Sequence, residues 1–345
     1  MRVVHVVLPG DIDDPATPSG GNGYDRRICR GLGGAGWTVR EHPVPGGWPR
    51  PGAGERAASA RVLAALPDRA VVLLDGLVAS AVPEVLAPQS RRLRLVVLVH
   101  MPLETDAEGD ALAVAVGVVA TSEWTRRRLL DRYALPAERV WTATPGVDPA
   151  PVGAGSAAGT ALLCVAAVTP QKGHDVLATA LARVADLPWT CHWVGTLARD
   201  PGFVDRLRRQ LAESGLADRV RLLGPRTGEA LAAAYAGADL LVLPSRGETY
   251  GMVVTEALAR GVPVLGTDAG GLPEALGHAP DGSRPGLLVP PADPEALAGG
   301  LRRWLTDPGL RARLRRSARD RRGTLTDWAV TSSRLSAALK EATAA

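Results

Sequence analysis

The chain has 345 residues, of which 46% are hydrophobic and 22% are charged. This balance excludes a disordered or fibrous chain, and the length suits two domains. The longest apolar run, residues 111–120, is too short to span a membrane. The first 14 residues are typical of a buried strand and its turn rather than of a signal peptide, so we expect a cytoplasmic protein.

The net charge of +4 is unevenly distributed. Residues 1–150 contain 17 arginines and 17 acidic residues, so the excess lies in the second half, much of it in residues 301–322. Leucines recur there at near-helical spacing among arginines, which predicts two short helices with solvated faces. A patch for nucleic acid or an anionic membrane is the alternative, but one Phe and four Tyr leave few side chains to stack on bases. We expect no nucleic-acid partner and disfavour membrane association.

Candidate metal ligands are few. The three cysteines, Cys29, Cys164 and Cys191, lack metal-ligand spacing and lie in apolar or mixed segments, as buried free thiols do. The aspartates within residues 11–14 precede a proline and are typical of a turn. We therefore expect no metal and no cofactor.

Short β-branched runs alternate with helical segments along the first half, as in a parallel α/β sheet. The predicted strands there are residues 3–8, 70–76, 93–100 and 116–122, and the predicted helices are 24–35, 55–66 and 123–133. The second half repeats the pattern, with strands at 161–168, 189–195, 219–224, 238–244 and 262–268.

Two similar halves indicate an α/β fold of two doubly wound, Rossmann-like domains that face a cleft. Residues 144–160 are rich in Pro, Gly and small residues and resemble an interdomain linker. We therefore expect one domain over residues 1–150 and a second over 151–326. A last segment, 327–345, contains a helix at 327–343 that we expect to pack back on the first domain.

The strongest chemical signal is the segment PSRGETYGMVVTEALARG, residues 244–261. A strand ends at its start, a turn carries Glu248, and a helix begins near Gly251 with Glu256 on its second turn. Free amides at that helix end suit phosphate oxygens, and Glu256 suits a ribose diol. Glu248 lies beyond the phosphate end and suits sugar hydroxyls. The alternative is that both glutamates are surface carboxylates, although Glu256 has apolar neighbours.

Two further segments place chemistry at strand ends. VAAVTPQKGHDVL, residues 165–177, puts Lys172 at a helix start, where an ammonium suits a diphosphate. A solvated turn lysine is the alternative, yet the chain uses lysine only twice against 38 arginines. In PSGGNGYDRRI, residues 18–28, glycines allow a close approach to a ligand or simply make a flexible loop.

His100 ends a predicted strand on the side where ligands bind in parallel sheets. It is therefore placed to contact a substrate, with a core or structural histidine as the alternative. The run GLGGAG, residues 31–36, matches a dinucleotide-binding spacing but follows a helix and precedes a strand. That order predicts the end of a helix and a turn.

Taken together, these segments resemble glycosyltransferase family 4, the retaining glycosyltransferases of the GT-B fold. The likeness runs through SGGNGYDRRICRGL, PGVD, KGHDVL, LPSRGETYGMVVTEALARGVPVLGTDAGGLPEALG and GLLVPPADPEALAGGLRRWL. The two glutamates with seven residues between them, joined to the Lys-Gly and Gly-Gly-x-Pro-Glu elements, are specific in combination.

The resemblance implies a nucleotide-sugar donor held mainly by the second domain and an acceptor held mainly by the first. The catalytic residues it implies are His100, Lys172 and Glu248. The donor-binding residues it implies are Gly20, Gly21, Lys172, Gly251, Met252, Val253 and Glu256. Separately from the resemblance, we expect Arg246 or Arg226 to supply a further cation for the diphosphate. Tyr24 and Asn22 are expected acceptor contacts.

One departure concerns the diphosphate. The family usually has Gly-Arg where this chain has Ala166 and Ala167, so another group must compensate for that arginine. A charge-assisted hydrogen bond contributes roughly 1.5–3 kcal/mol.

The activity implied is metal-independent transfer of a hexose from a UDP- or GDP-linked sugar to a hydroxyl, with retention of configuration. The neutral first half favours a soluble small-molecule acceptor, with a membrane lipid or polysaccharide precursor as the alternative. The same segments also suit a sugar phosphorylase of this fold or a catalytically silent sugar-binding subunit.

Overall fold

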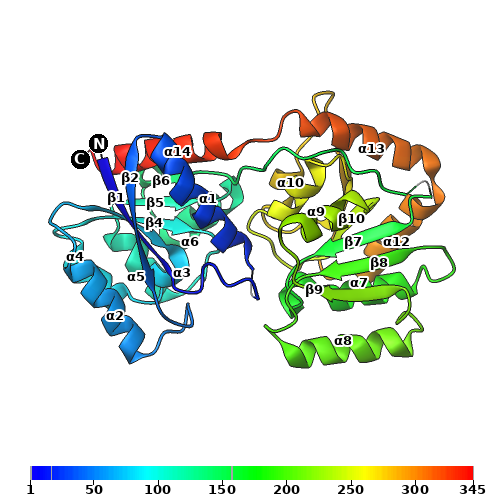
Figure 1. Cartoon of the computed structure of the whole chain (residues 1–345), viewed down its shortest axis with the longest axis horizontal. Coiled ribbons are helices and arrows are strands. Elements are labelled where there is room, and N and C mark those ends of the chain that lie inside the picture. Colours follow the sequence, from blue (N-terminus) through cyan, green and yellow to red (C-terminus); the bar gives the residue numbers. More distant parts are fainter. Residues whose placement is uncertain (1, 17, 157, 345) are drawn as a thin grey trace. The chain divides into compact units, whose positions relative to one another are not determined.

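The structure is a computed structural model that describes residues 2–16, 18–156 and 158–344. It divides into two compact units (Figure 1). The first unit comprises Met1–Asp14, Gly20–Gly146 and Thr326–Ala345, and the second comprises Pro15–Ser19 and Val147–Leu325. Within the described residues, none of the helices combines the length and the apolar character needed to cross a membrane.

The first unit is built on a parallel six-stranded sheet in the order β2-β1-β3-β4-β5-β6. Its strands are β1 (Arg2–Pro9), β2 (Trp37–Val44), β3 (Val71–Asp75), β4 (Arg94–Val99), β5 (Gly117–Ala120) and β6 (Val140–Thr142). Its helices are α1 (Gly20–Gly34), α2 (Ala53–Ala64), α3 (Gly76–Ala79), α4 (Pro83–Gln89), α5 (Asp106–Val114), α6 (Glu123–Tyr133), the 3₁₀ turn η1 (Ala137–Arg139) and α14 (Trp328–Ala342).

Helices cover both faces of this sheet, because its central strands are apolar on both sides. Buried residues of α2 to α6 pack with one set of strand residues, among them Val72 and Leu74. On the other side α14 packs on α1, and Trp37 Nε1 donates a hydrogen bond to Ser336 Oγ at 2.9 Å (Figure 1). The expectation that the C-terminal helix packs back on the first half is confirmed.

The second unit carries a parallel six-stranded sheet in the order β12-β11-β10-β7-β8-β9. Its strands are β7 (Ala161–Val165), β8 (Thr190–Val194), β9 (Val220–Gly224), β10 (Leu240–Leu243), β11 (Val264–Thr267) and β12 (Gly286–Val289). Its helices are the 3₁₀ turn η2 (Pro170–Lys172), α7 (His174–Ala182), α8 (Pro201–Glu213), α9 (Gly228–Ala236), α10 (Met252–Leu258), α11 (Leu272–Leu276), α12 (Pro294–Thr306) and α13 (Pro308–Arg322).

Local sequence signals start several of these helices. Asp200, Asp293 and Asp307 each cap a helix whose first residue is proline. An aspartate oxygen accepts a backbone N–H that the helix leaves free, and proline needs no such bond at that position. The two helices predicted within residues 301–322 are confirmed as α12 and α13. Most of their leucines and Trp304 are buried against the sheet.

Every strand expected from a continuous apolar run is confirmed, whereas β2, β6 and β12 were missed. These three strands lie at sheet edges, where one side of the strand is solvated and the apolar run is broken or short. Helix α1 begins at Gly20 rather than at 24, so the glycines expected in a loop form its first turn. The run at 31–36 ends that helix and turns into β2, as expected.

Candidate functional site

Each sheet has one point where the strand order reverses, and ligands of doubly wound sheets bind beyond the carboxyl ends of the strands at such points. In the second unit the point lies between β7 and β10. The loop after β7 carries Lys172, and the loop after β10 carries Glu248. The two residues that sequence analysis singled out there are therefore brought together by topology.

Lys172 and Glu248 form an ion pair, with Nζ and Oε1 2.6 Å apart. Ser245 Oγ donates a second hydrogen bond to the same oxygen at 3.0 Å. The Glu248 side chain is 9% exposed and that of Lys172 is 29% exposed, so a ligand reaches the ammonium more easily than the carboxylate.

The loop that holds Glu248 is fixed by backbone contacts. Thr267 Oγ1 donates to the Ser245 carbonyl at 2.6 Å, and the Gly271 amide donates to the Glu248 carbonyl at 2.7 Å. Gly270 has φ +60°, and a Cβ there would lie 1.9 Å from the Glu248 carbonyl oxygen. The Gly-Gly turn thus lets two loops approach closely, which positions the carboxylate before any ligand arrives.

Glu256 lies on α10, the helix that directly follows that loop. The buried Tyr235 hydroxyl donates a hydrogen bond to Glu256 Oε2 at 2.7 Å. Burial, and then the nearby Glu256 charge, raise the pKa of Tyr235, so the phenol stays a donor. The helix begins after Gly251, whose φ is +94°, and Met252 and Val253 in its first turn are half-buried.

The two arginines expected near the diphosphate differ in their surroundings. Both guanidinium ends of Arg246 bond the Asp175 carboxylate, at 2.8 and 2.7 Å, and Arg246 also bonds the Pro170 carbonyl. Its positive charge is therefore balanced locally. Arg226 lies exposed in the loop between β9 and α9.

In the first unit the strand order reverses between β1 and β3. Asp75 ends β3 and His100 follows β4, so these side chains lie at neighbouring carboxyl ends. Asp25 comes from α1, which follows β1. His100 Nε2 lies 2.7 Å from Asp25 Oδ1 and 3.6 Å from Asp75 Oδ2. One ligating atom from each residue lies within 4.8 Å of the others.

The acceptor contacts expected on α1 have different positions. Tyr24 is 1% exposed, its hydroxyl donates to the Ala143 carbonyl at 2.8 Å, and its ring edge meets His100 and Trp328. This position suits support of His100 rather than contact with a substrate. Asn22 is half-buried in the first turn of the helix, and Gly20 there is exposed.

Gly21 packs directly on His100. A Cβ at Gly21 would lie 3.4 Å from the nearest ring carbon of that histidine. The glycine therefore lies against the imidazole in the first turn of α1, and the ring has little room to turn on that side.

Asp25 and Asp75 were not predicted as site residues from the sequence. A signal for Asp75 was present, because a polar residue ended a buried strand next to the strand that precedes His100. Asp25 gave no such signal, since an aspartate in an arginine-rich helix is indistinguishable from a solvated one. It is 2% exposed in the fold.

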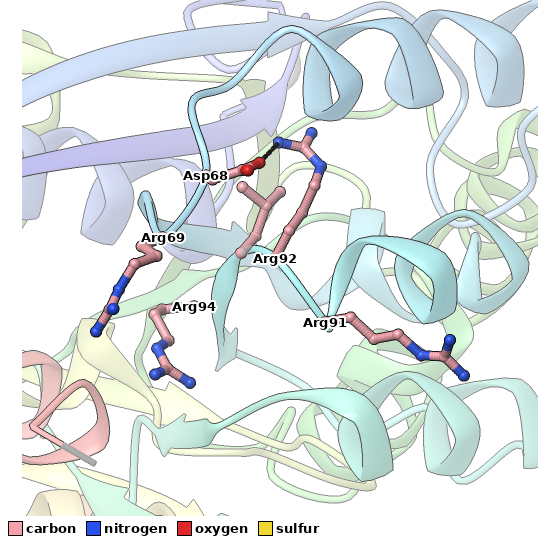
Figure 2. Close-up of a pocket in the computed structure, with 6 residues that line it drawn as sticks. Asp68, Arg69, Arg91, Arg92 and Arg94 are labelled. Atoms are coloured by element: carbon pink, nitrogen blue, oxygen red, sulfur yellow. Dashed lines mark hydrogen bonds and ion pairs between the residues drawn. The ribbon is translucent and has the colours of Figure 1, made fainter.

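A hollow of about 390 Å³ lies elsewhere on the first unit, before the starts of β3 and β4. Figure 2 shows Arg92 reaching back to Asp68, with which it forms a 3.2 Å ion pair. Arg69, Arg91 and Arg94 line the same hollow. This is the amino-terminal edge of the sheet, opposite to Asp75 and His100, and we do not assign it to the candidate site.

Two doubly wound parallel units, each with its polar residues at the switch point, constitute the GT-B glycosyltransferase fold. Solved structures share it over nearly the whole chain. HepE of Anabaena in complex with UDP and glucose has a TM-score of 0.76 at 20% identity and 99% coverage of both chains. Sucrose-phosphate synthase from Thermosynechococcus elongatus has a TM-score of 0.77 at 21% identity and 97% coverage of both.

Sequence comparison is more specific for the second unit. Residues 158–321 match the family model described as "Glycosyl transferases group 1". Two relatives are D-inositol 3-phosphate glycosyltransferases. That of Jonesia denitrificans is 33% identical over 232 residues, 61% of this chain and 54% of the relative. That of Thermobispora bispora is 34% identical over 253 residues, 68% and 58% respectively. The chain thus spans a little over half the length of these relatives.

Proposed function

We propose that the protein is a retaining, metal-independent glycosyltransferase that moves a hexose from a nucleoside diphosphate sugar to an acceptor hydroxyl. The observation that carries the proposal is the Lys172–Glu248 pair at the switch point of the second unit, followed on α10 by Glu256. The second unit would hold the donor, and the first would hold the acceptor.

In this proposal Lys172 and the amides of Met252 and Val253 bind the diphosphate. Glu256 accepts hydrogen bonds from the ribose hydroxyls, with Tyr235 holding its carboxylate in place. Glu248 receives hydroxyls of the donor sugar. A carboxylate oxygen that already accepts hydrogen bonds from Lys172 and Ser245 is held in place, which suits binding hydroxyls better than attacking carbon.

The chemistry we propose is a front-face displacement. The departing phosphate oxygen takes the acceptor proton as the acceptor oxygen bonds to the anomeric carbon on the same face. Negative charge grows on the phosphate, where Lys172 stabilises it. Preorganised charge of this kind is commonly the largest contribution to catalysis.

For the acceptor we propose a soluble small molecule. The relatives named as D-inositol 3-phosphate glycosyltransferases support a small polyol or its phosphate. A membrane lipid or polysaccharide precursor is tested by sedimentation with vesicles of anionic phospholipid. Strong binding to these vesicles would contradict the soluble acceptor.

The proposal is tested by incubating the protein with UDP-, GDP-, ADP- and dTDP-linked hexoses and a panel of cyclitols and sugars. We expect release of one nucleoside diphosphate that depends on donor and acceptor, and a product with the donor's anomeric configuration by proton NMR. An inverted product would contradict retention. Turnover with hexose 1-phosphate alone would indicate a phosphorylase, and nucleotide binding without turnover would indicate a silent subunit.

The missing arginine gives a second test. Ala167 is half-buried just after β7, on the loop that leads to Lys172. If the diphosphate is short of one cation, Ala167→Arg should tighten nucleoside diphosphate binding by about tenfold or more. Ala198→Arg, in the loop after β8, is the control for added charge. Unchanged or weaker binding in Ala167→Arg would mean that other groups already neutralise the diphosphate.

A further inference from the structure

The Asp25–His100–Asp75 cluster holds more negative charge than a buried site usually tolerates. The side chains of Asp25 and Asp75 are 2% and 4% exposed. Two carboxylates beside a neutral imidazole would bury two uncompensated charges, which is costly. The cluster therefore needs a cation or a proton.

Its geometry favours a proton on the histidine. The 2.7 Å separation between His100 Nε2 and Asp25 Oδ1 is the length of a charge-assisted hydrogen bond, and such a bond places hydrogen on Nε2. Asp75 Oδ1 is already bound by the amides of Leu77 and Val78, at 2.7 and 3.2 Å, which fixes Oδ2 toward the imidazole. The buried Asp25 Oδ2 has no hydrogen-bond partner among the described residues, so that carboxylate depends on His100.

The position of the ring decides which atom can serve a ligand. The His100 side chain is 13% exposed, more than either carboxylate. Because Nε2 is directed at Asp25, Nδ1 is the ring nitrogen left for a substrate. Gly21 and Tyr24 pack against the ring and limit its rotation.

We propose that Asp25 and Asp75 are positioning residues that keep His100 protonated, so that Nδ1–H serves as a cationic hydrogen-bond donor to a substrate oxygen. A histidine held in this way does not act as a general base. The oxygen belongs to a sugar hydroxyl or a phosphate, and this part of the inference rests on the proposed function. The protonation state does not.

Three ionisable groups face His100 among the residues that the structure describes, namely Asp25 and Tyr24 from α1 and Asp75 from the end of β3. Burial and the Asp25 charge raise the pKa of Asp75, while the His100 charge opposes that rise. Burial lowers the pKa of His100, but the Asp25 charge and hydrogen bond and the Asp75 charge raise it more, so its net shift is upward. Burial also raises the pKa of the Tyr24 phenol, which stays neutral.

Protonation is measured by NMR titration of the full chain labelled with ¹⁵N-histidine. We expect His100 to titrate above the ordinary value of 6.5 and to carry its proton on Nε2 once deprotonated. Asp25→Asn should lower that pKa most and Asp75→Asn less, because Asp75 lies farther from Nε2. An asparagine at 75 can still cap α3, so this variant also keeps the test open if Asp25→Asn fails to fold.

Asp68→Asn is the matched control, because it removes a carboxylate of the same unit that is 78% exposed and lies at the opposite sheet edge. It should leave the pKa of His100 unchanged. A wild-type pKa at or below 6.5, or one that Asp25→Asn does not lower, would overturn the proposal. So would stoichiometric binding of Mn²⁺ or Zn²⁺ that shifts the His100 resonances, because a metal-bound imidazole is not protonated.

Activity separates this inference from the proposed function. The protonated form is lost as pH rises through the pKa of His100, so wild-type kcat/KM should fall on the alkaline side. In Asp25→Asn that fall should begin at lower pH. Transfer activity with a His100 that titrates normally would overturn only the inference. A raised pKa in a protein without transfer activity would overturn only the proposed function.

Discussion

The two sheets pair carboxylates with different basic groups at their switch points. In the first unit two buried carboxylates surround His100, whereas in the second Glu248 meets Lys172 directly. His174, the histidine next to the second site, is buried. This burial is the main cause that lowers its pKa, to about 3. The pKa of the same residue type therefore rises where nearby carboxylates outweigh burial and falls where burial outweighs nearby charge.

We expect the largest loss of activity when the ion pair of the second unit is broken. Lys172→Ala removes the cation from the proposed diphosphate site, so we expect kcat to fall about 100- to 1,000-fold with little change in thermal stability. Lys340→Ala, on the exposed end of α14, is the control for loss of a lysine. Activity of Lys172→Ala within fivefold of wild type would contradict the role given to this residue.

The close approach of Gly270 to the Glu248 backbone can be tested through the free energy of unfolding. Gly270→Ala should lower the free energy of unfolding by about 2–3 kcal/mol, because its φ is positive and its Cβ would meet the Glu248 carbonyl. Gly215 also has a positive φ, but open space surrounds its Cβ position. Gly215→Ala should therefore cost about 1 kcal/mol. Equal losses in a denaturant titration would mean that the contact with Glu248 adds nothing.

The contributions of His174 and His100 to the free energy of unfolding should change with pH in opposite directions. The folded-state pKa of His174 lies below its unfolded value, so its contribution is present above about 6.5 and is lost as pH falls. We expect a loss of about 2–3 kcal/mol between pH 6.5 and 4.5, which His174→Leu should reduce.

The contribution of His100 has the reverse sign, because its pKa is raised on folding. It is fully present below 6.5 and is lost as pH rises through the folded-state value. Asp25→Asn should therefore flatten the alkaline part of the stability profile and leave the acid part. Thermal unfolding from pH 4.5 to 9 measures both, and a single slope shared by all three proteins would contradict the contrast.

A smaller effect, on nucleotide affinity, is expected when the hydrogen bond from Tyr235 to Glu256 is removed. Tyr235→Phe removes the hydroxyl that holds this carboxylate and should weaken nucleoside diphosphate binding by about tenfold. Tyr133→Phe removes a comparable bond, 2.6 Å to Glu108, in the first unit. It should leave nucleotide affinity unchanged. The same change in both variants, measured by calorimetry, would mean that the effect is not local to the proposed ribose site.

The sequence predicted the central strands, because their apolar runs are continuous. It also singled out Lys172 and Glu248 as candidates, and the fold brings these two residues together. The sequence did not predict three of the four edge strands, β2, β6 and β12, whose solvated sides interrupt the apolar pattern. Asp25 was missed because burial of a single aspartate in a polar helix follows from tertiary packing. The pairing of Arg246 with Asp175 depends likewise on two loops that meet only in the fold.

The most direct test of the central claim is calorimetric titration of UDP, GDP, ADP and dTDP into the wild-type protein, Lys172→Ala and Glu256→Ala. We expect one nucleotide to bind the wild type saturably, and its binding to weaken by at least tenfold in each variant. Equal binding to all three proteins, or no nucleotide binding to the wild type, would contradict a nucleotide-sugar site at the switch point of the second unit.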